Sequence, residues 1–386
     1  MKKPKLILHI GHGKTGTTSL QHYLYQNAAD ILKLGYLYPV KNSSRENHVL
    51  LPAGFIIENT SLVARKQVYQ DDFRRYKKDF QRFWASLLLD IEKYSPHTVI
   101  LSAEQMFRDF SGISRIPLAD YLGQFFSDVT VVAYMRSPAP DFFSRLAQRA
   151  KTGTRVLDVA PRKIRSVIEY YESQFPGCVK LHPFDRQQLL AGDILHDFFS
   201  RYVPEALPAI EALKIRPANT SLPWPLLRGL HEIRRRSQPD AERPSLSTSA
   251  RVFAAAQDYS RLHPKKQKYD VSLQPAVEDF LRRSAVEHLW LKERYGVAFA
   301  DLDYTRIEAL HSPFAEDEPL ERIVDFSRCP QSAFPVERYL GNGPRFWMNY
   351  LYFFLRLEYA RLHRVYIHDS WAWRLTRSMS RKRRAG

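Results

Sequence analysis

Residues 5–19 read KLILHIGHGKTGTTS, and this run predicts a strand, a glycine-rich turn and a helix in succession. The apolar segment Lys5–Ile10 is typical of a buried strand, and helical residues follow over Thr18–Asn27. In a turn of this kind, successive backbone N–H groups and the positive end of the helix dipole form an anion site. The sequence therefore predicts a phosphate-binding loop at the end of the first strand.

Further strands alternate with helices along the chain. Thr98–Ser102 and Val129–Met135 are apolar, β-branched runs typical of parallel strands buried on both faces, and Cys178–His182 is a weaker strand. Amphipathic helices are expected over Asp71–Lys93 and Asp193–Tyr202. This alternation predicts an α/β fold, a doubly wound and mostly parallel sheet flanked by helices.

The chain is expected to form one large domain over residues 1–330, with a helical insertion around residues 225–300. Within the insertion, Ala276–Tyr295 has helical periodicity and meets Gly296 as a C-cap. A basic, aromatic and helical C-terminal extension is expected over residues 331–386.

The loop departs from the Walker A pattern GxxxxGK[ST] in the place of its lysine. Gly11, Gly16 and Thr18 fit the pattern. Thr17 occupies the lysine position, and the loop's own lysine, Lys14, comes three residues early. A triphosphate site needs its lysine at the β- and γ-phosphates and a hydroxyl on magnesium. A lysine at the apex of the loop suits a shorter ligand with a terminal second group, such as a phosphosulfate, which needs no metal.

These residues resemble the 5′-phosphosulfate-binding loop of sulfotransferases that use 3′-phosphoadenosine 5′-phosphosulfate (PAPS), especially bacterial and carbohydrate sulfotransferases of P-loop NTPase-like fold. In that family the lysine contacts the leaving oxygen, and the loop hydroxyls and amides hold the 5′-phosphate. The resemblance implies the first role for Lys14 and the second for Thr15, Gly16, Thr17 and Thr18. The alternative is a glycine-rich turn that binds nothing.

A second basic site is expected because PAPS also carries a 3′-phosphate. Arg136 ends the strand Val129–Met135, and Ser144 follows in an Arg-x-Pro-x5-Ser pattern that resembles the family's 3′-phosphate motif. The planar fork of Arg136 suits bidentate phosphate binding. An arginine before Ser-Pro is also a common start of a helix. Residues 216–221 resemble an Arg-x-x-Asn-x-Ser segment of bacterial members, and a helix cap explains them equally well.

Sulfuryl transfer also needs a base that takes the proton of the acceptor, and sulfotransferases use His or Glu. His48 follows the first helix in an expected loop, titrates near neutrality and lies in an Asn-His-x-Leu segment that resembles bacterial relatives. Glu104 comes just past the strand Thr98–Ser102, where this fold exposes side chains to the site. Both residues have a structural alternative: His48 could cap a helix, and the carboxylate of Glu104 could pair with a nearby basic residue. His12, inside the loop, is a candidate for contact with the sulfuryl group.

The 386-residue chain carries a formal charge of +17, which indicates an anionic partner or a basic solvated surface. Nucleic acid is not expected, because no helix-turn-helix, zinc-finger or RNP pattern accompanies the charge. The two cysteines, Cys178 and Cys329, form no Cys/His cluster, which argues against a zinc site and fits a reducing compartment. No apolar run approaches the roughly 18–20 residues of a transmembrane helix. We expect a soluble, cytoplasmic protein, with the inner face of the membrane as the alternative.

The C-terminal segment combines aromatic residues with arginines over residues 346–364, and a basic run follows at residues 381–384. A helix of this composition could lie on an anionic membrane surface through residues 346–386. It could equally pack on the domain or on a second subunit. The composition leaves these alternatives open.

Taken together, the two motifs predict an enzyme, a sulfotransferase that moves the sulfuryl group of PAPS to a hydroxyl or amine without a metal. The resemblance to carbohydrate-modifying members implies a glycan or glycolipid acceptor. One alternative is a P-loop nucleotide kinase or NTPase. The other is a basic adaptor at the membrane periphery with an inactive nucleotide-binding fold.

Overall fold

The computed structural model describes residues 2–41, 43, 46–57, 73–153, 155–208, 222–237 and 271–329. Backbone contacts divide the chain into two compact units. The first unit comprises Met1–Arg145, Val159–Thr220 and Pro275–Ala315, and the second comprises Leu146–Asp158, Ser221–Gln274 and Glu316–Gly386. Residues 1–330, expected as one domain, are thus divided between the units. The extension at 331–386 and its membrane-contact segment lie outside the described residues.

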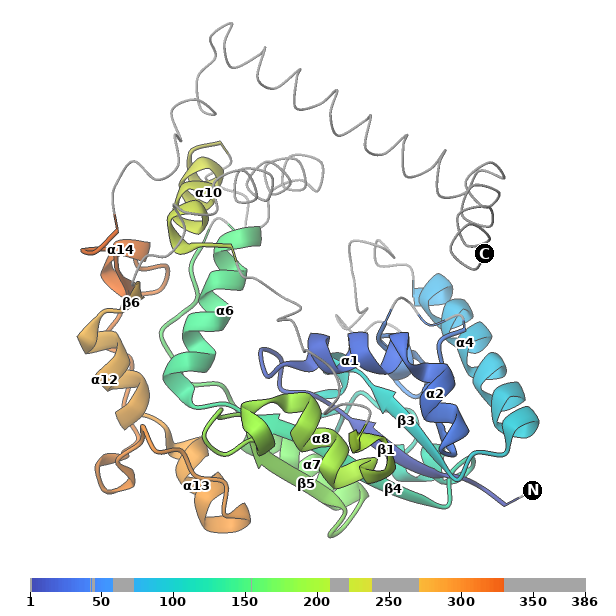
Figure 1. Cartoon of the computed structure of the whole chain (residues 1–386). Helices are drawn as coiled ribbons and strands as arrows, with labels where there is room; N and C mark the ends of the chain where they lie inside the picture. The colour runs from blue at the N-terminus through green and yellow to red at the C-terminus, as the bar shows by residue number, and fades with distance from the viewer. Residues whose placement is uncertain are drawn as a thin grey trace, which may run out of the picture. The chain divides into compact units, whose positions relative to one another are not determined.

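The first unit is built on a parallel sheet of five strands (Figure 1). Its spatial order is β2-β3-β1-β4-β5, and all four neighbouring pairs are parallel. The strands are β1 Lys5–His9, β2 Tyr36–Leu37, β3 Thr98–Ser102, β4 Asp128–Met135 and β5 Val179–Pro183. The predicted α/β class and the parallel sheet are therefore confirmed.

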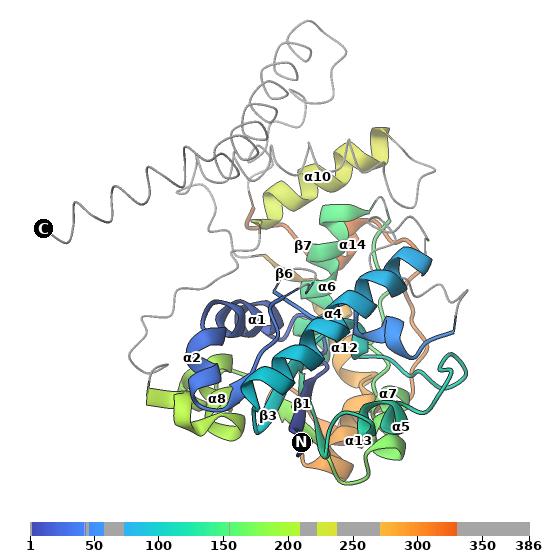
Figure 2. The same ribbon diagram turned by 90° about the vertical axis from the view of Figure 1, so that its right-hand side faces the viewer.

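Helices cover both faces of this sheet, because alternate residues of each strand point to opposite sides. Leu6 and Leu8 enter the cluster of α4 and α7, whereas Ile7 enters the cluster of α1 and α8. In Figure 2 the strands β1 and β3 lie between α4 on one side and α1, α2 and α8 on the other. These helices are α1 Thr17–Gln26, α2 Ala28–Lys33, α4 Phe73–Tyr94, α7 Arg165–Gln174 and α8 Ile194–Tyr202.

The connections of the sheet diverge between β1 and β4. From β1 the chain runs to β2 and β3 on one side, and from β4 it runs to β5 on the other. In open α/β sheets, ligands bind outside the carboxyl ends of the strands at such a switch point. The loop that carries Lys14 follows β1, and Arg136 follows β4 directly. The topology therefore brings both predicted anchors to one edge of the sheet.

The expected helix Ala276–Tyr295 is divided into α12 Pro275–Arg283 and α13 Val286–Tyr295. The break has a local cause: Ala285 leaves the helical backbone region, at φ −81° and ψ 43°, and the hydroxyl of Ser284 donates to the carbonyl of Phe280 (2.7 Å). Gly296 ends α13 with φ 68°, so the expected C-cap is confirmed. The remaining α-helix in the described part of the first unit is α5 Leu118–Gly123, and α6 Pro138–Thr152 contributes residues to both units.

The described part of the second unit contains α10 Trp224–Ser237, α14 Leu320–Ile323 and an antiparallel pair, β6 Ser272–Leu273 and β7 Val324–Asp325. Arg228 of α10 pairs with Glu321 of α14 (2.9 Å), which joins the two helices. In the part of the chain that the structure describes, every helix is too short or too polar to cross a bilayer.

Candidate functional site

The loop between β1 and α1 has an unusual backbone. Gly11, Gly13 and Gly16 adopt positive φ angles, and Lys14 does so too, at 64°. A left-handed conformation costs a side-chain-bearing residue roughly 1–2 kcal/mol, and such residues cluster at functional sites. A Cβ on Gly16 would come within 3.0 Å of Ile194 and Phe184, so this close approach to the loop requires glycine. Lys14 lies in the middle of this turn, between Gly13 and Gly16.

The hydroxyl groups of the loop divide into buried and exposed ones. Thr15 and Thr17 are buried, with their Oγ1 atoms 3.4 Å apart, and Thr18 is exposed. Gly16 caps α1 without a side-chain hydrogen bond, and the first turn of α1 contains no acidic residue. The first N–H groups of the helix therefore have no carboxylate of their own turn to bind, which suits an external anion.

Arg136 lies directly against the loop. Its Nη1 donates to the carbonyl oxygen of Lys14 (3.0 Å), and its guanidinium lies 5.8 Å from the ring centre of Phe184. Nε2 of His288 on α13 donates to the backbone carbonyl of Arg136 (3.0 Å). The two predicted anchors are therefore neighbours in space, and α13 holds the second of them in place.

Ser144 lies on α6, the helix that follows Arg136, as the motif predicts. It is the seventh residue of α6, about 9 Å along the axis from the first residue of that helix. It follows Asp141 by three residues and therefore shares its side of the helix. No hydrogen bond joins Ser144 to Arg136 among the described residues, and their expected pairing on one phosphate stays a prediction.

Glu104 adjoins the loop from the third strand of the site. It begins a single 3-10 turn, Glu104–Met106, immediately after β3. A Cβ on Gly11 would lie 3.3 Å from its Cγ, so the carboxylate stem packs on the loop. Burial raises the pKa of Glu104, and the positive charges of Lys14 and Arg162 partly oppose that rise. The carboxyl group of Glu104 therefore lies within electrostatic range of Lys14.

His48 is a core residue, and its predicted role as general base is contradicted by its contacts. Its exposed fraction is 1%. The backbone N–H of Ser102 donates to Nδ1 (2.9 Å), and Nε2–H donates to the carbonyl of Pro39 (2.9 Å). Burial lowers its pKa to about 4, so the ring is neutral at pH 7. Neither nitrogen is free to accept a substrate proton, because hydrogen bonds to the backbone use both.

Replacing His48 should therefore affect stability. We expect His48→Ala to lower the free energy of unfolding by about 2–4 kcal/mol, because it leaves a cavity and two buried backbone groups without partners. Denaturant unfolding followed by circular dichroism measures this change. The exposed His311 provides the matched control, and His311→Ala should change stability by less than about 0.5 kcal/mol. A His48 variant of unchanged stability that loses turnover would restore the base assignment.

Three charged residues beside the loop were missed from the sequence. Asp141 on α6 is buried, and it pairs with Nε of Arg145 (2.7 Å) and with Nη2 of Arg162 (3.4 Å). Nη1 of Arg162 donates to the backbone carbonyl of His12. The spacing of Asp141 and Arg145 is an (i, i+4) helical pair that the sequence could have suggested. Arg162 lies in no recognisable motif, and only the fold brings it to the loop.

The ring of His12 is buried beneath the loop, edge-on to Phe107 at 4.9 Å. Burial and then the charge of Arg162 hold its pKa well below the usual value, so it is neutral. Neither ring nitrogen has a hydrogen-bond partner among the described residues. At an exposed fraction of 1%, His12 is enclosed by the protein, and its predicted contact with a ligand would require the surrounding side chains to move.

The charges around the loop favour an anion. The cationic side chains are Lys14, Arg136, Arg145 and Arg162, and the carboxylates are Glu104 and Asp141. The cluster thus contains two more cations than carboxylates, and the buried Nε of Arg162 has no hydrogen-bond partner among the described residues. These features fit a ligand with at least two negative charges. In the described part of the chain, no group of three His, Cys, Asp or Glu side chains is placed to hold a metal.

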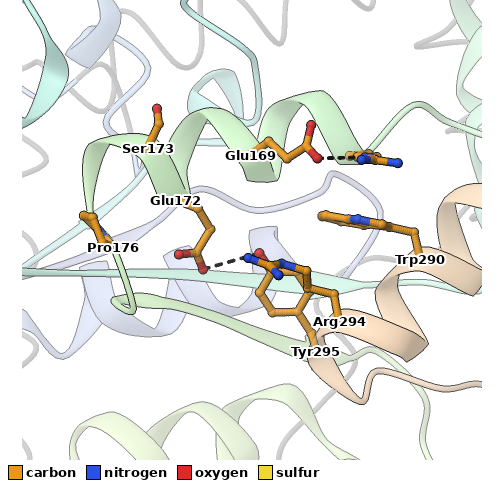
Figure 3. Close-up of a pocket in the computed structure, with 8 residues that line it drawn as sticks. Glu169, Glu172, Ser173, Pro176, Trp290, Arg294 and Tyr295 are labelled. Atoms are coloured by element: carbon orange, nitrogen blue, oxygen red, sulfur yellow. Dashed lines mark hydrogen bonds and ion pairs between the residues drawn. The ribbon is translucent and has the colours of Figure 1, made fainter.

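A separate cavity of about 490 Å³ lies between α7 and α13 (Figure 3). It is lined by Arg165, Glu169, Glu172, Ser173, Pro176, Trp290, Arg294 and Tyr295. Arg165 pairs with Glu169 (2.7 Å) and covers the ring of Trp290 at 5.6 Å. None of the predicted site residues lines this cavity. The segment 216–221, whose Arg-x-x-Asn-x-Ser pattern was singled out above, lies outside the described residues.

Comparison of the chain with protein-family models, with curated proteins and with solved structures gives no match. The fold and the site define the class of protein instead. It is an α/β protein with a parallel, doubly wound sheet, and a basic glycine-rich loop lies at the switch point of that sheet.

Proposed function

We propose that this chain is a PAPS-dependent sulfotransferase of P-loop NTPase-like fold. The observation that carries the proposal is the placement of Lys14, at the apex of a glycine-rich loop and beside Arg136. The strand order β2-β3-β1-β4-β5, with the loop after the central strand, supports the assignment of the fold. The surplus of positive charge around the loop supports a multiply anionic donor.

In this proposal, different residues in and beside the loop bind different groups of the donor. Thr15, Gly16, Thr17 and Thr18, with the N–H groups that open α1, hold the 5′-phosphate, and of the three hydroxyls that of Thr18 is exposed in this structure. The ammonium of Lys14 stabilises the oxygen that leaves the sulfuryl group. Arg136 binds the 3′-phosphate with the N–H groups that the Lys14 carbonyl does not use. Ser144 on α6 is the second candidate for the same phosphate.

Glu104 takes the place of His48 as the general base. Its carboxyl group is coupled to both Lys14 and Arg162, whereas His48 is enclosed in the core. A carboxylate beside the transferred group can accept the proton of an incoming hydroxyl. Burial raises its pKa, and this makes it a stronger base than an exposed carboxylate.

The dependence of kcat/KM on pH should be bell-shaped. The acid limb reports deprotonation of Glu104, and it should lie above the range of an ordinary carboxyl because burial raises that pKa. The alkaline limb reports loss of the Lys14 proton, and it should lie below the range of an ordinary lysine because burial lowers that pKa. Rates measured across pH with Glu104→Gln as the control test this, since the variant should lose the acid limb. A limb that persists in Glu104→Gln would show that another group is the base.

A nucleoside kinase or triphosphatase is the second candidate. It is favoured by one observation: Glu104 follows β3 and contacts the loop, where a carboxylate could assist a magnesium ion. Titration calorimetry with 3′-phosphoadenosine 5′-phosphate (PAP), and separately with ATP and magnesium, decides between the two. Tighter binding of ATP with magnesium would contradict the sulfotransferase proposal.

The acceptor is a glycan or glycolipid in this proposal, on the resemblance of the loop to carbohydrate sulfotransferases. A screen of polysaccharide and lipid pools with PAPS labelled in its sulfur atom tests it directly. Deleting residues 334–386 tests the adaptor alternative, because an enzyme should keep PAPS binding without its C-terminal segment.

A further inference from the structure

We propose that Arg162 is a catalytic residue that binds the sulfuryl oxygens of the donor during transfer. This inference rests on the proposed function and extends it, because the sequence motifs assign only Lys14 and Arg136. Arg162 comes from the segment before α7, outside both motifs. Its position against the loop carries the argument.

The guanidinium of Arg162 lies on the loop where glycine leaves room for it. A Cβ on Gly13 would come 3.6 Å from Nη1 and 3.8 Å from Nη2 of Arg162. Nη1 donates to the carbonyl of His12, which fixes the group one residue from Gly13 and two from Lys14. A planar cation is thereby held beside the residue whose ammonium serves the leaving oxygen.

Arg162 is a half-buried cation that is incompletely paired. Its side chain is 24% exposed, and its Nε is buried with no hydrogen-bond partner among the described residues. Its carboxylate partner, Asp141, lies 3.4 Å from Nη2 and is shared with Arg145, which approaches more closely at 2.7 Å. Burial lowers the pKa of Arg162, and arginine nevertheless remains charged at neutral pH. A half-buried cation that shares one carboxylate can gain from an anionic oxygen beside it.

Sulfuryl transfer supplies such an oxygen. The sulfur–oxygen bond to the 5′-phosphate breaks, and a new sulfur–oxygen bond forms to the acceptor oxygen, whose proton passes to Glu104. The electron pair of the broken bond stays on the phosphate oxygen, which Lys14 faces. The three remaining sulfuryl oxygens share negative charge in the bound donor, and Arg162 is a cation on the loop that this proposal assigns to neither the leaving oxygen nor the 3′-phosphate. Stabilisation of charge by fixed donors is a main source of rate in such transfers.

The test compares two ligands that differ by the sulfuryl group. Titration calorimetry on the full chain should show that Arg162→Ala weakens PAPS binding by about tenfold, whereas PAP binding changes by less than about threefold. Arg162→Lys should recover part of the PAPS affinity, because it keeps the charge without the fork. Arg145→Ala is the matched control, since it removes the other partner of Asp141 without touching the loop. It should change the two affinities by the same factor.

Each other outcome has a defined meaning. Equal losses of PAPS and PAP affinity in Arg162→Ala would show that the residue only supports the loop, and the inference would be wrong. Unchanged affinity for both ligands would equally overturn it. If Arg162→Ala melts at a lower temperature than the unmodified chain, the comparison is made with Arg162→Lys instead. A ratio of PAPS to PAP affinity in Arg162→Lys equal to that of the unmodified chain would then reject the inference. If the unmodified chain binds neither ligand, the proposed function itself fails.

Discussion

Lys14→Ala should lower the rate of sulfuryl transfer by about 100- to 1,000-fold, the loss expected when one donor to a developing negative charge is removed. The physical reason is that negative charge grows on the departing phosphate oxygen, and the ammonium at the apex of the loop is placed to meet it. Sulfur-labelled PAPS measures the transfer to an acceptor, or to water where no acceptor is supplied.

The fold should survive this substitution, because the backbone of Lys14 is already left-handed. At a φ of 64°, alanine and lysine carry nearly the same strain, so the free energy of unfolding should change by less than about 1 kcal/mol. Lys33→Ala is the matched control: it removes a lysine whose side chain is 76% exposed on α2. Turnover should be unchanged there. Wild-type turnover in Lys14→Ala would remove Lys14 from the chemistry and leave the loop with a binding role alone.

Arg136→Ala should weaken the binding of PAP by about 100-fold, the upper end of what a charge-assisted phosphate contact contributes. Binding of adenosine 5′-phosphate should fall by less than about threefold, because that nucleotide lacks the 3′-phosphate. Titration calorimetry with the two nucleotides measures both losses on the same protein.

The comparison also addresses the contact between Arg136 and the loop. Because Nη1 donates to the carbonyl of Lys14, the alanine variant could disturb the loop itself. Loop disturbance would weaken both nucleotides by a similar factor, and this result would contradict the assignment of Arg136 to the 3′-phosphate. Arg136→Lys keeps the charge but not the planar fork, so it should bind PAP with an affinity between those of the alanine variant and the unmodified chain.

Four of the five strands of the parallel sheet and the loop after β1 could be predicted because their signals are local, whereas the two-residue strand β2 was not predicted. Thr98–Ser102 is predicted to the residue, and β1, β4 and β5 are displaced by one residue at an end or at both. Each is a short apolar run between polar or glycine-containing segments, which periodicity detects. The break between α12 and α13 was missed, since helical periodicity continues through Ser284 and Ala285 while the backbone does not.

Side-chain environments were predicted less well, and the histidine shows why. The expected loop around His48 follows from its polar neighbours in the sequence, Glu46 and Asn47. The ring is held by the backbone of Pro39, nine residues before it, and by that of Ser102, which lies 54 residues away and is brought to it by the fold. Arg162 is the converse case, because an unremarkable arginine is carried to the loop by the path of the chain between α6 and α7.

The amino-acid sequence by itself determined the α/β class, the strand–loop–helix unit around Lys14 and the arginine at the end of a later strand. These depend on neighbours in the chain, whose hydrophobic spacing and glycine content set the local backbone. Only the tertiary structure decided that β4 lies next to β1, which brings Arg136 to the carbonyl of Lys14. It also placed Glu104 and Arg162 against the same loop and buried His48 in the core. Strand order and burial arise from contacts between residues distant in sequence, and no local pattern encodes them.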